Sequence, residues 1–369
     1  MVKDADGDPF VSRWWMGTGS PVDLLDEESE RWWREQAKGA LRLGVEGIKA
    51  DDGEGYYLPE DVRLGDTSGA RAAWAFGGAY RRSMQRALDE VHPGRGVLFG
   101  RCGWTGQQAI GMTWAGDQAS DFWSLRQLVA ATISAAASGF SNWSHDVGGY
   151  IGEAMVRRCP PELLVRWAQL GAFTPLMQAH GRMQQEPWTY DAHTLELYRG
   201  YVLLHEMLVP YIRAAAATAA HCGLPIVRPL ALLQPGDHVA WSVADAFGFG
   251  PALWVAPVLE RGAAEREVML PRGRWIEAWS GEVVEGGREV VVATPLERIP
   301  VWVREGSIVV TYAAESVARG LGEEDAAKPL VATLWGEPRM GRAAVRLADG
   351  RRIAWSRRQG WELPDGVLV

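Results

Sequence analysis

Cysteine is scarce in this chain, which has three cysteines among 369 residues. None of them forms a CxxC pair, and the odd number excludes a framework in which every cysteine is bridged. The seven histidines show neither the HxxxH nor the HExxH spacing of a zinc site. We therefore expect no metal and no cofactor, and the unpaired thiols favour a reducing compartment, the cytoplasm.

Long apolar runs and basic clusters are missing as well. No window of about 18 apolar residues offers a membrane span, and the first residues lack the apolar core of a signal peptide. The net charge of −8, without a local basic patch, argues against binding to nucleic acid. A glycine-rich loop followed by a helix, which would bind a phosphate, is also absent. We expect neither a membrane nor a nucleic acid as a partner.

Tryptophan, in contrast, is abundant. The chain has 19 tryptophans against 9 tyrosines and 8 phenylalanines. The indole ring is large and flat, and it suits both a large core and a wall that stacks on sugars. We interpret most of these tryptophans as core residues and a minority as the wall of a pocket.

Helical and strand patterns alternate from residue 20 to about residue 230. Asp26 is predicted to cap a helix whose acidic first turn holds Glu27 and Glu28 and whose amphipathic stretch covers 31–42. Further helices are predicted at 70–90, 121–137, 161–170 and 191–221, and strands at 45–50, 96–100, 140–144, 174–179 and 225–230. This alternation predicts an α/β fold with a parallel sheet, a partial (β/α)8 TIM-type barrel that holds about the last five βα units.

After residue 245 the pattern changes to short strands separated by turns that contain glycine and proline. Such a pattern is typical of a small antiparallel β-sandwich domain. We therefore assign residues 1–244 to the partial barrel and 245–312 to a proximal β domain. Residues 313–369 are interpreted as a linker followed by the start of a distal β domain.

Polar residues follow the predicted strands. Asp51 comes directly after the first strand, Arg101 after the second, Asp146 after the third and His180 after the fourth. In a (β/α)8 barrel the chemistry lies where strands end and loops begin. One polar cluster at each strand end is poorly explained by solvation alone, so we expect these residues to share a site.

Two aspartates, Asp51 and Asp117, qualify as the carboxyl pair of a retaining glycosidase. Such an enzyme needs two carboxyl groups about 5–5.5 Å apart across the sugar. One attacks the anomeric carbon, and the other protonates the leaving oxygen and then deprotonates water. The pair alone is not specific, because the chain has 46 acidic residues and an aspartate at a strand end is more often a loop cap.

The segments around both aspartates resemble glycoside hydrolase family 31, the α-glucosidase and α-xylosidase family. The resemblance covers roughly residues 1–312, and its segments are KADDGE at 49–54, RCGWTGQQ at 101–108, WAGDQ at 114–118, SHDVGGY at 144–150 and HGRMQQEPW at 180–188. The later segment LPRGRWIEAWSGE at 270–282 resembles the start of the family's first C-terminal β domain.

The resemblance implies a retaining α-glycoside hydrolase that cleaves terminal α-linked glucosyl or xylosyl residues by double displacement. Asp51 is then the nucleophile and Asp117 the general acid/base. We expect Arg101 to lower the pKa of Asp51 by its opposite charge, and burial near Trp114 to keep Asp117 protonated. The residues that we assign to sugar binding are Lys49, Arg101, Trp114, Asp146 and His180.

Two residues near the nucleophile depart from the family's commonest pattern. Many α-glucosidases of the family carry a tryptophan where this chain has Lys49, and a lysine there is closer to the α-xylosidase branch. That branch carries KTDFGE, in which a phenylalanine stands where this chain has Asp52. The choice between α-xylosides, α-glucosides and other α-glycosides therefore stays open.

The family's N-terminal β-sandwich and first barrel strands have no counterpart in this sequence. Five strands do not close a barrel, so we expect a fragment, or one part of a split gene, whose missing N-terminal half is supplied by the full-length gene. Alone it should be poorly soluble and weakly active or inactive. The alternative to an enzyme is a non-catalytic fragment or carbohydrate-binding remnant, and a phosphosugar or nucleotide enzyme on the same barrel is the third interpretation.

Overall fold

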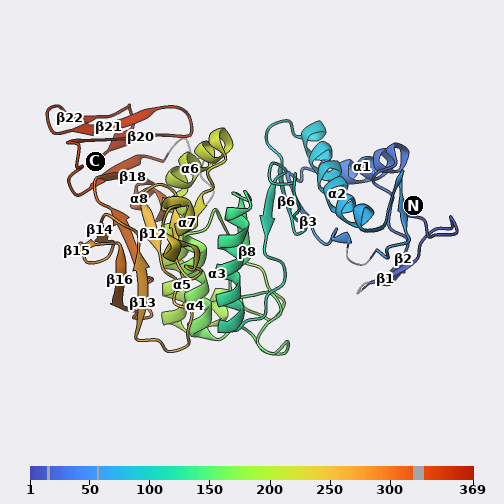
Figure 1. Cartoon of the computed structure of the whole chain (residues 1–369), viewed down its shortest axis with the longest axis horizontal. Coiled ribbons are helices and arrows are strands. Elements are labelled where there is room, and N and C mark those ends of the chain that lie inside the picture. Colours follow the sequence, from blue (N-terminus) through green and yellow to red (C-terminus); the bar gives the residue numbers. More distant parts are fainter. Residues whose placement is uncertain (15–16, 56–57, 319–327) are drawn as a thin grey trace. The chain divides into compact units, whose positions relative to one another are not determined.

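The structure is a computed structural model that describes residues 1–14, 17–55, 58–318 and 328–369. It contains two compact units, Met1–Trp114 and Ala115–Val369 (Figure 1). None of the helices in the described part of the chain combines the length and the apolar character that a bilayer crossing requires. The three cysteines are free thiols, of which Cys102 and Cys159 are buried.

The first unit contains parallel strands at its centre. β3 (Gly47–Ala50) pairs with β6 (Val97–Gly100), and β6 pairs with β7 (Met112–Trp114). The sequence does not predict β7, because three residues are too few to show the alternation of a strand. Short antiparallel pairs also lie in this unit, β1 (Ser12–Trp14) with β2 (Gly17–Gly19) and β4 (Arg63–Leu64) with β5 (Thr67–Ser68).

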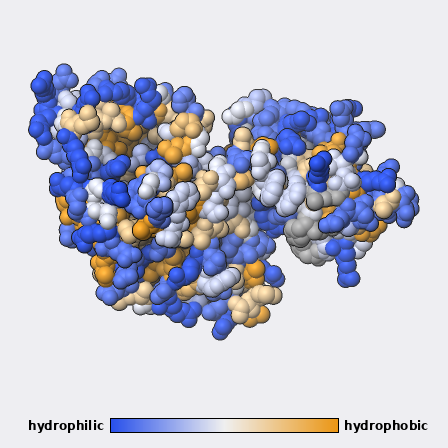
Figure 2. Space-filling model, viewed as in Figure 1, coloured by the Kyte–Doolittle hydropathy of each residue, from blue (hydrophilic) through white to orange (hydrophobic). Residues whose placement is uncertain are grey.

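Two helices pack on these strands. α1 (Glu27–Leu41) begins where the sequence predicts, since the carboxylate of Asp26 accepts the amide of Ser29 at 2.8 Å. α2 (Gly69–Val91) contacts α1, β3 and β6. Figure 2 shows mostly hydrophilic side chains on the visible face of these helices. Their inner faces supply an apolar cluster with the strands, which includes Leu41, Ala50, Met84, Leu88 and Leu98.

The second unit contains a parallel pair of strands, β8 (Trp143–Asp146) and β9 (Leu176–Gln178). Its longer helices are α3 (Phe122–Ala137), α4 (Pro161–Ala172), α5 (Ala192–Met207) and α6 (Val209–Cys222), and its short ones are η2 (Pro187–Thr189), α7 (Leu230–Leu233), η3 (His238–Trp241) and α8 (Ala314–Ala318). The single helix predicted over 191–221 divides at Leu208, because Pro210 has no amide hydrogen to continue the helix.

Mostly antiparallel sheets follow in the same unit. The largest has the order β10-β11-β12-β17-β14-β15, and smaller ones are β13-β16, β18-β19-β23 and β20-β21-β22. The first of these strands are β10 (Val227–Arg228), β11 (Phe247–Phe249), β12 (Leu253–Val255), β13 (Glu265–Leu270), β14 (Arg274–Glu277), β15 (Val283–Glu285) and β16 (Arg288–Ala293). The others are β17 (Val301–Arg304), β18 (Ser307–Tyr312), β19 (Leu330–Trp335), β20 (Arg342–Arg346), β21 (Arg352–Ser356), β22 (Gly360–Glu362) and β23 (Val367–Leu368).

One predicted strand lies in a different sheet from the one expected. The segment 225–230 forms β10, which pairs antiparallel with β11 through Val227 and Phe249 instead of extending the parallel strands. The predicted boundary between 244 and 245 therefore falls between two paired strands. Part of the predicted linker at 313–329 lies outside the described residues, and Ala314–Ala318 forms α8. Parallel strands that alternate with helices, followed by these sheets, confirm the predicted partial (β/α)8 barrel with a β domain.

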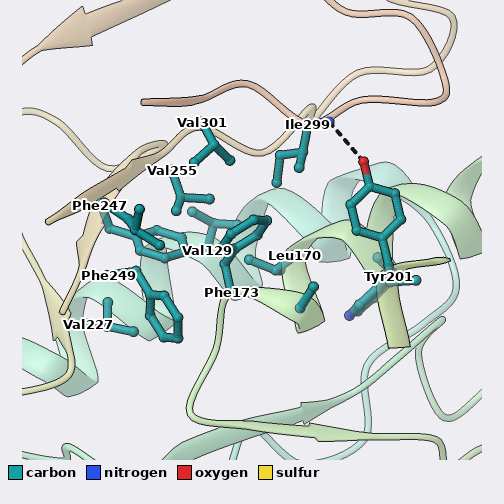
Figure 3. Packing of buried hydrophobic residues seen from close by; sticks show 14 of the residues in the cluster. Val129, Leu170, Phe173, Tyr201, Val227, Phe247, Phe249, Val255, Ile299 and Val301 are labelled. Carbon is teal, nitrogen blue, oxygen red and sulfur yellow. Dashed lines mark hydrogen bonds between the residues drawn. The ribbon is translucent and has the colours of Figure 1, made fainter. Parts of the chain in front are cut away.

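An apolar core joins the helices and the β sheets of the second unit. Figure 3 shows Phe173, at the end of α4, close to Phe249 of β11, and their ring centroids are 6.2 Å apart in an edge-to-face arrangement. The same view shows the hydroxyl of Tyr201 on α5, which accepts the amide of Ile299 at 3.3 Å. That hydroxyl also donates to the carbonyl of Glu297 at 2.8 Å. The helices and the β domain therefore share one packed interior.

A buried arginine adds polar contacts to this interior. Arg166 on α4 is 2% exposed. Its guanidinium donates to the carbonyls of Thr294 at 2.6 Å, Pro295 at 3.0 Å and Arg298 at 3.1 Å. Burial lowers the pKa of Arg166. These bonds fix the segment before β17 on the helix, so we call Arg166, Tyr201 and segment 294–299 the interdomain clamp.

Candidate active site

Asp51 and Arg101 directly follow two neighbouring strands, at the edge of the sheet where both strands end. Asp51 follows the last residue of β3, and Arg101 follows the last residue of β6. The residues before them, Ala50 and Gly100, are register partners. As a result, Nη1 of Arg101 lies 3.1 Å from Oδ1 of Asp51. The structure thus brings these two predicted residues together at the carboxyl ends of their strands.

Arg101 also binds two further carboxylates of the nucleophile segment. Its Nε donates to Oε1 of Glu54 at 2.7 Å, and its Nη2 donates to Oδ1 of Asp52. Burial acts to lower the pKa of Arg101, but the hydrogen bond and charge of Glu54, with the charges of both aspartates, raise it overall. The guanidinium therefore orients the acidic side chains of this segment, as expected for its contact with Asp51, and its assignment to sugar binding stays a prediction.

The two carboxylate oxygens of Asp51 have different surroundings. Oδ1 accepts the amide of Asp52 at 2.8 Å in addition to its contact with Arg101. Asp52 has a φ of 53°, in the left-handed region that aspartate tolerates better than most residues. Oδ2 accepts no hydrogen bond from any described residue, and 53% of the Asp51 side chain is exposed. One oxygen is therefore held in place while the other is accessible.

A cavity of about 780 Å³ adjoins Asp51 within the first unit. This volume is in the range of small-molecule sites. Asp51 and Asp52 belong to its wall, and the aromatic residues of its lining are Trp14, Trp33, Phe76 and Tyr80. Burial, with the nearby acidic groups, raises the pKa of Tyr80 to about 12, so its hydroxyl keeps its proton at neutral pH. Aromatic faces beside carboxylates suit a ligand with both C–H faces and hydroxyl groups.

Lys49 and Trp114 form a separate contact in the first unit. The ammonium of Lys49 lies 4.3 Å from the Trp114 ring and 5.6 Å from the ring of Phe99. Trp114 is 1% exposed and meets Phe99 edge-on at 5.2 Å. The sequence led us to expect an indole face open to sugar, but in this structure the ring is buried and Lys49 lies against it. A cation over an indole is a favourable contact.

Arg81 on α2 is a residue that the sequence analysis missed. It is fully buried, and it donates to the carbonyls of Cys102 at 2.8 Å and Met112 at 3.0 Å. It also donates to the hydroxyl of Thr113 at 2.9 Å and to the carbonyl of Ile110. Cys102 and Ile110 lie near the two ends of the loop that joins β6 to β7, and Met112 and Thr113 belong to β7 itself. Arg81 therefore fixes the backbone directly after Arg101.

In the second unit, Asp117 lies on the loop between β7 and α3 and is exposed. The burial that we expect around this carboxyl group involves Trp114, which belongs to the first unit, and it stays a prediction. The loop itself is well anchored. The carbonyl of Gln118 accepts the amides of Tyr150 at 2.9 Å and Ile151 at 3.0 Å, and the hydroxyl of Ser120 donates to Gly148 at 2.6 Å. The SHDVGGY segment thus holds the loop of the predicted acid/base.

One glycine of that segment, Gly149, is required by its close approach to the loop. Gly149 has a φ of 77°, and a Cβ there would lie 2.9 Å from the carbonyl oxygen of Ala119. A side chain would be strained by the backbone conformation and would also displace the loop. Backbone conformation and packing therefore both require a glycine at position 149.

At the end of β8, the side chains of Asp146 and His145 have different surroundings. Asp146 is fully buried, and its Oδ1 accepts a hydrogen bond from Nε2 of Gln178, its register partner on β9. His145, which the sequence analysis left outside the site, accepts the indole N–H of Trp167 on its Nδ1 at 3.1 Å. Its remaining proton is therefore on Nε2. Burial lowers the pKa of His145 to about 3, so the ring is neutral and has a packing role.

His180 is exposed beyond β9 and stacks on Tyr150, with ring centroids 4.9 Å apart. The contact joins the HGRMQQEPW segment to the SHDVGGY segment, as does the hydrogen bond from Gln185 to the carbonyl of Gly149. Asp117, Asp146 and His180 thus occur on segments that contact one another in the second unit. Among the residues that the structure describes, no group of three or more His, Cys, Asp or Glu side chains is arranged to hold a metal ion.

Comparisons with family models and with known proteins agree on one family. The model of the glycosyl hydrolases family 31 TIM-barrel domain matches residues 1–215, and the model of the family 31 C-terminal domain matches residues 223–309. The sulfoquinovosidase of Escherichia coli (strain K12) is 35% identical over 320 residues, which are 83% of this chain and 46% of that protein. Alpha-glucosidase 2 of Bacillus thermoamyloliquefaciens is 28% identical over 326 residues, 84% of this chain and 40% of that protein.

Solved structures agree with this result. The cycloalternan-degrading enzyme from Trueperella pyogenes, in complex with covalent intermediate, superposes with a TM-score of 0.76 at 31% identity. The likeness covers 83% of this chain and 43% of that one, so this chain spans less than half the length of each of these proteins. Because the family's barrel model matches more than half of its residues, the chain belongs to glycosyl hydrolase family 31.

Proposed function

We propose that the protein is a retaining α-glycoside hydrolase that releases terminal glucosyl or xylosyl residues by double displacement. The observation that carries this proposal is the state of Asp51. Its Oδ1 is held by Arg101 and by the amide of Asp52, while its Oδ2 accepts no hydrogen bond from the described residues. A nucleophilic carboxylate needs a fixed orientation and an accessible oxygen, and Asp51 has both.

The reaction then has two steps. Oδ2 of Asp51 forms a bond to the anomeric carbon as the bond to the leaving oxygen breaks, and Asp117 gives its proton to that oxygen. In the second step Asp117 takes a proton from water, which attacks the anomeric carbon and releases Asp51. The Trueperella pyogenes relative, whose structure contains a covalent intermediate, supports this two-step course for the family.

Sugar recognition is proposed for two groups of residues. In the first unit, the aromatic lining of the cavity stacks on the sugar ring, and Arg101 with Lys49 supplies positive charge near the nucleophile. In the second unit, Asp146 and His180 supply polar contacts. The name of the Bacillus relative supports a glucosyl residue, and Lys49 favours a xylosyl residue. We further propose a reducing compartment, the cytoplasm, because the three thiols are free.

A slow substrate tests the nucleophile directly. Incubation with 5-fluoro-α-glucosyl fluoride or its xylosyl analogue should add one glycosyl group to the protein, and peptide mass spectrometry should locate it on Asp51. Asp51→Asn should abolish both the adduct and the turnover of p-nitrophenyl α-glycosides. Asp61→Asn, at an exposed position in the same segment, is the matched control and should keep both. A labelled residue other than Asp51, or release of the β anomer, would overturn the proposal.

The role of Asp117 has its own test. Asp117→Ala should lose turnover of glycosides with poor leaving groups by about 100-fold or more, and keep far more activity on α-glycosyl fluorides, which need no proton. Azide should restore rate to this variant and give an α-glycosyl azide. If the wild-type protein binds α-glycosides and gives neither turnover nor adduct, the alternative of a carbohydrate-binding remnant holds.

A further inference from the structure

We propose that Asp52 makes the cavity beside Asp51 selective for uncharged glycosyl residues and against glycosyl residues that carry a sulfonate or carboxylate group. The inference rests on the proposed function, since it takes the glycosyl residue to enter this cavity. It concerns the residue that occupies the place of a phenylalanine in the family segment KTDFGE. Neither nucleophile nor acid/base, Asp52 has no part in the two steps described above.

The position of Asp52 exposes its charge to the cavity. Its left-handed backbone, with a φ of 53°, puts its amide on Oδ1 of Asp51 and its carboxylate on Nη2 of Arg101. Its side chain remains 43% exposed and belongs to the cavity wall. An incoming sugar therefore meets this carboxylate next to the nucleophile.

The charges around Asp52 are not balanced. Three carboxylates, those of Asp51, Asp52 and Glu54, share the single guanidinium of Arg101, which leaves two negative charges in excess. The ammonium of Lys49 lies against the Trp114 ring and forms no ion pair with these carboxylates among the described residues. Arg13 on β1 also lines the cavity, but it is exposed to solvent. Even when it is counted in full, the charge of Arg13 leaves one negative charge in excess.

An anionic glycosyl residue is therefore repelled where a neutral one is accepted. Sugar hydroxyls can donate to the carboxylate of Asp52, whereas a sulfonate or carboxylate offers acceptors alone. Two like charges about 6 Å apart near a protein surface disfavour binding by roughly 10- to 100-fold. Specificity built by repulsion of the wrong ligand is common in binding sites.

Three p-nitrophenyl substrates that differ at C6 provide the test: the α-glucoside, the α-glucuronide and the α-sulfoquinovoside. We expect the wild-type kcat/KM for the glucoside to exceed those for both anions by at least about tenfold. Asp52→Asn keeps the side-chain size, an acceptor for Arg101 and tolerance of the left-handed backbone, and removes only the charge. It should reduce this ratio by about tenfold. Glu54→Gln removes the same charge from a side chain outside the cavity lining and should change the ratio less.

The possible failures are distinguishable. If no neutral or anionic substrate is turned over, the proposed function fails, and this inference fails with it. If the protein is active but the wild-type ratio is one or lower, or if Asp52→Asn leaves the ratio unchanged, only the inference is overturned. In that case Arg13→Gln shows whether Arg13 binds the anionic group, because the activity on the two anionic substrates would then fall selectively.

Discussion

Replacing Arg81 by methionine removes a guanidinium from the interior of the first unit and keeps much of the side chain's apolar volume. Arg81 is fully buried and serves four acceptors, the carbonyls of Cys102, Ile110 and Met112 and the hydroxyl of Thr113. A buried acceptor that loses its donor costs about 1–3 kcal/mol. Among the described residues no carboxylate pairs with Arg81. Removal of its buried, unpaired charge therefore adds about 1 kcal/mol to the free energy of unfolding.

Four acceptors at the low end of that range, less this relief, give an expected loss of about 3 kcal/mol in the free energy of unfolding. Urea unfolding of the full chain, followed by tryptophan fluorescence at pH 7, measures the loss. Arg82→Met is the matched control: Arg82 is exposed on the same helix, and its loss should stay within about 0.5 kcal/mol. An Arg81→Met protein as stable as this control would refute the role that we assign to the buried guanidinium.

Further predictions concern the second unit. Gly149→Ala places a Cβ 2.9 Å from a carbonyl oxygen, so its melting temperature should fall further than that of Gly223→Ala, whose φ of 75° is similar and whose Cβ meets nothing within 4 Å; equal melting temperatures would contradict this. Burial lowers the pKa of His145 to about 3 from 6.5, so the unfolded state binds the extra proton between these values and stability falls as the pH falls through this window. His145→Gln should flatten that slope in urea titrations from pH 7 to pH 4, and an unchanged slope would exclude His145 as its source. Arg166→Met should lower the free energy of unfolding by about 3 kcal/mol and make segment 294–299 an early site of proteolysis, and wild-type resistance to protease would contradict it.

The sequence predicts the outline of the fold because its signals are local. The cap at Asp26 and the amphipathic stretch after it predict α1 to within a residue at its end. β7 is missed since three residues between turns carry no periodicity, although this strand ends with Trp114. The strand at 225–230 is found but given the wrong partner, because pairing depends on contacts far along the chain.

The candidate site is also predicted only in part. Asp51 and Arg101 are predicted as neighbours because each follows a strand, and register then brings them together. The sequence does not indicate that Arg81 is buried, because the segment RRSMQR at 81–86 resembles the solvated face of a helix. Only the close approach of β6 and β7 shows which of its arginines is buried. The burial of Trp114 behind Lys49 likewise depends on packing that a motif does not contain.

The interdomain clamp has a consequence for protein engineering. Exchanging the C-terminal β domain for that of a homologue at residue 245 would remove the carbonyls that Arg166 binds, while the arginine itself remained on α4. A chimera therefore needs a donor segment with the same backbone path at 294–299, or a joint substitution of the arginine. The suitable cut for modular recombination is therefore not at the change of secondary-structure type, because the helices and sheets of this unit share one packed interior.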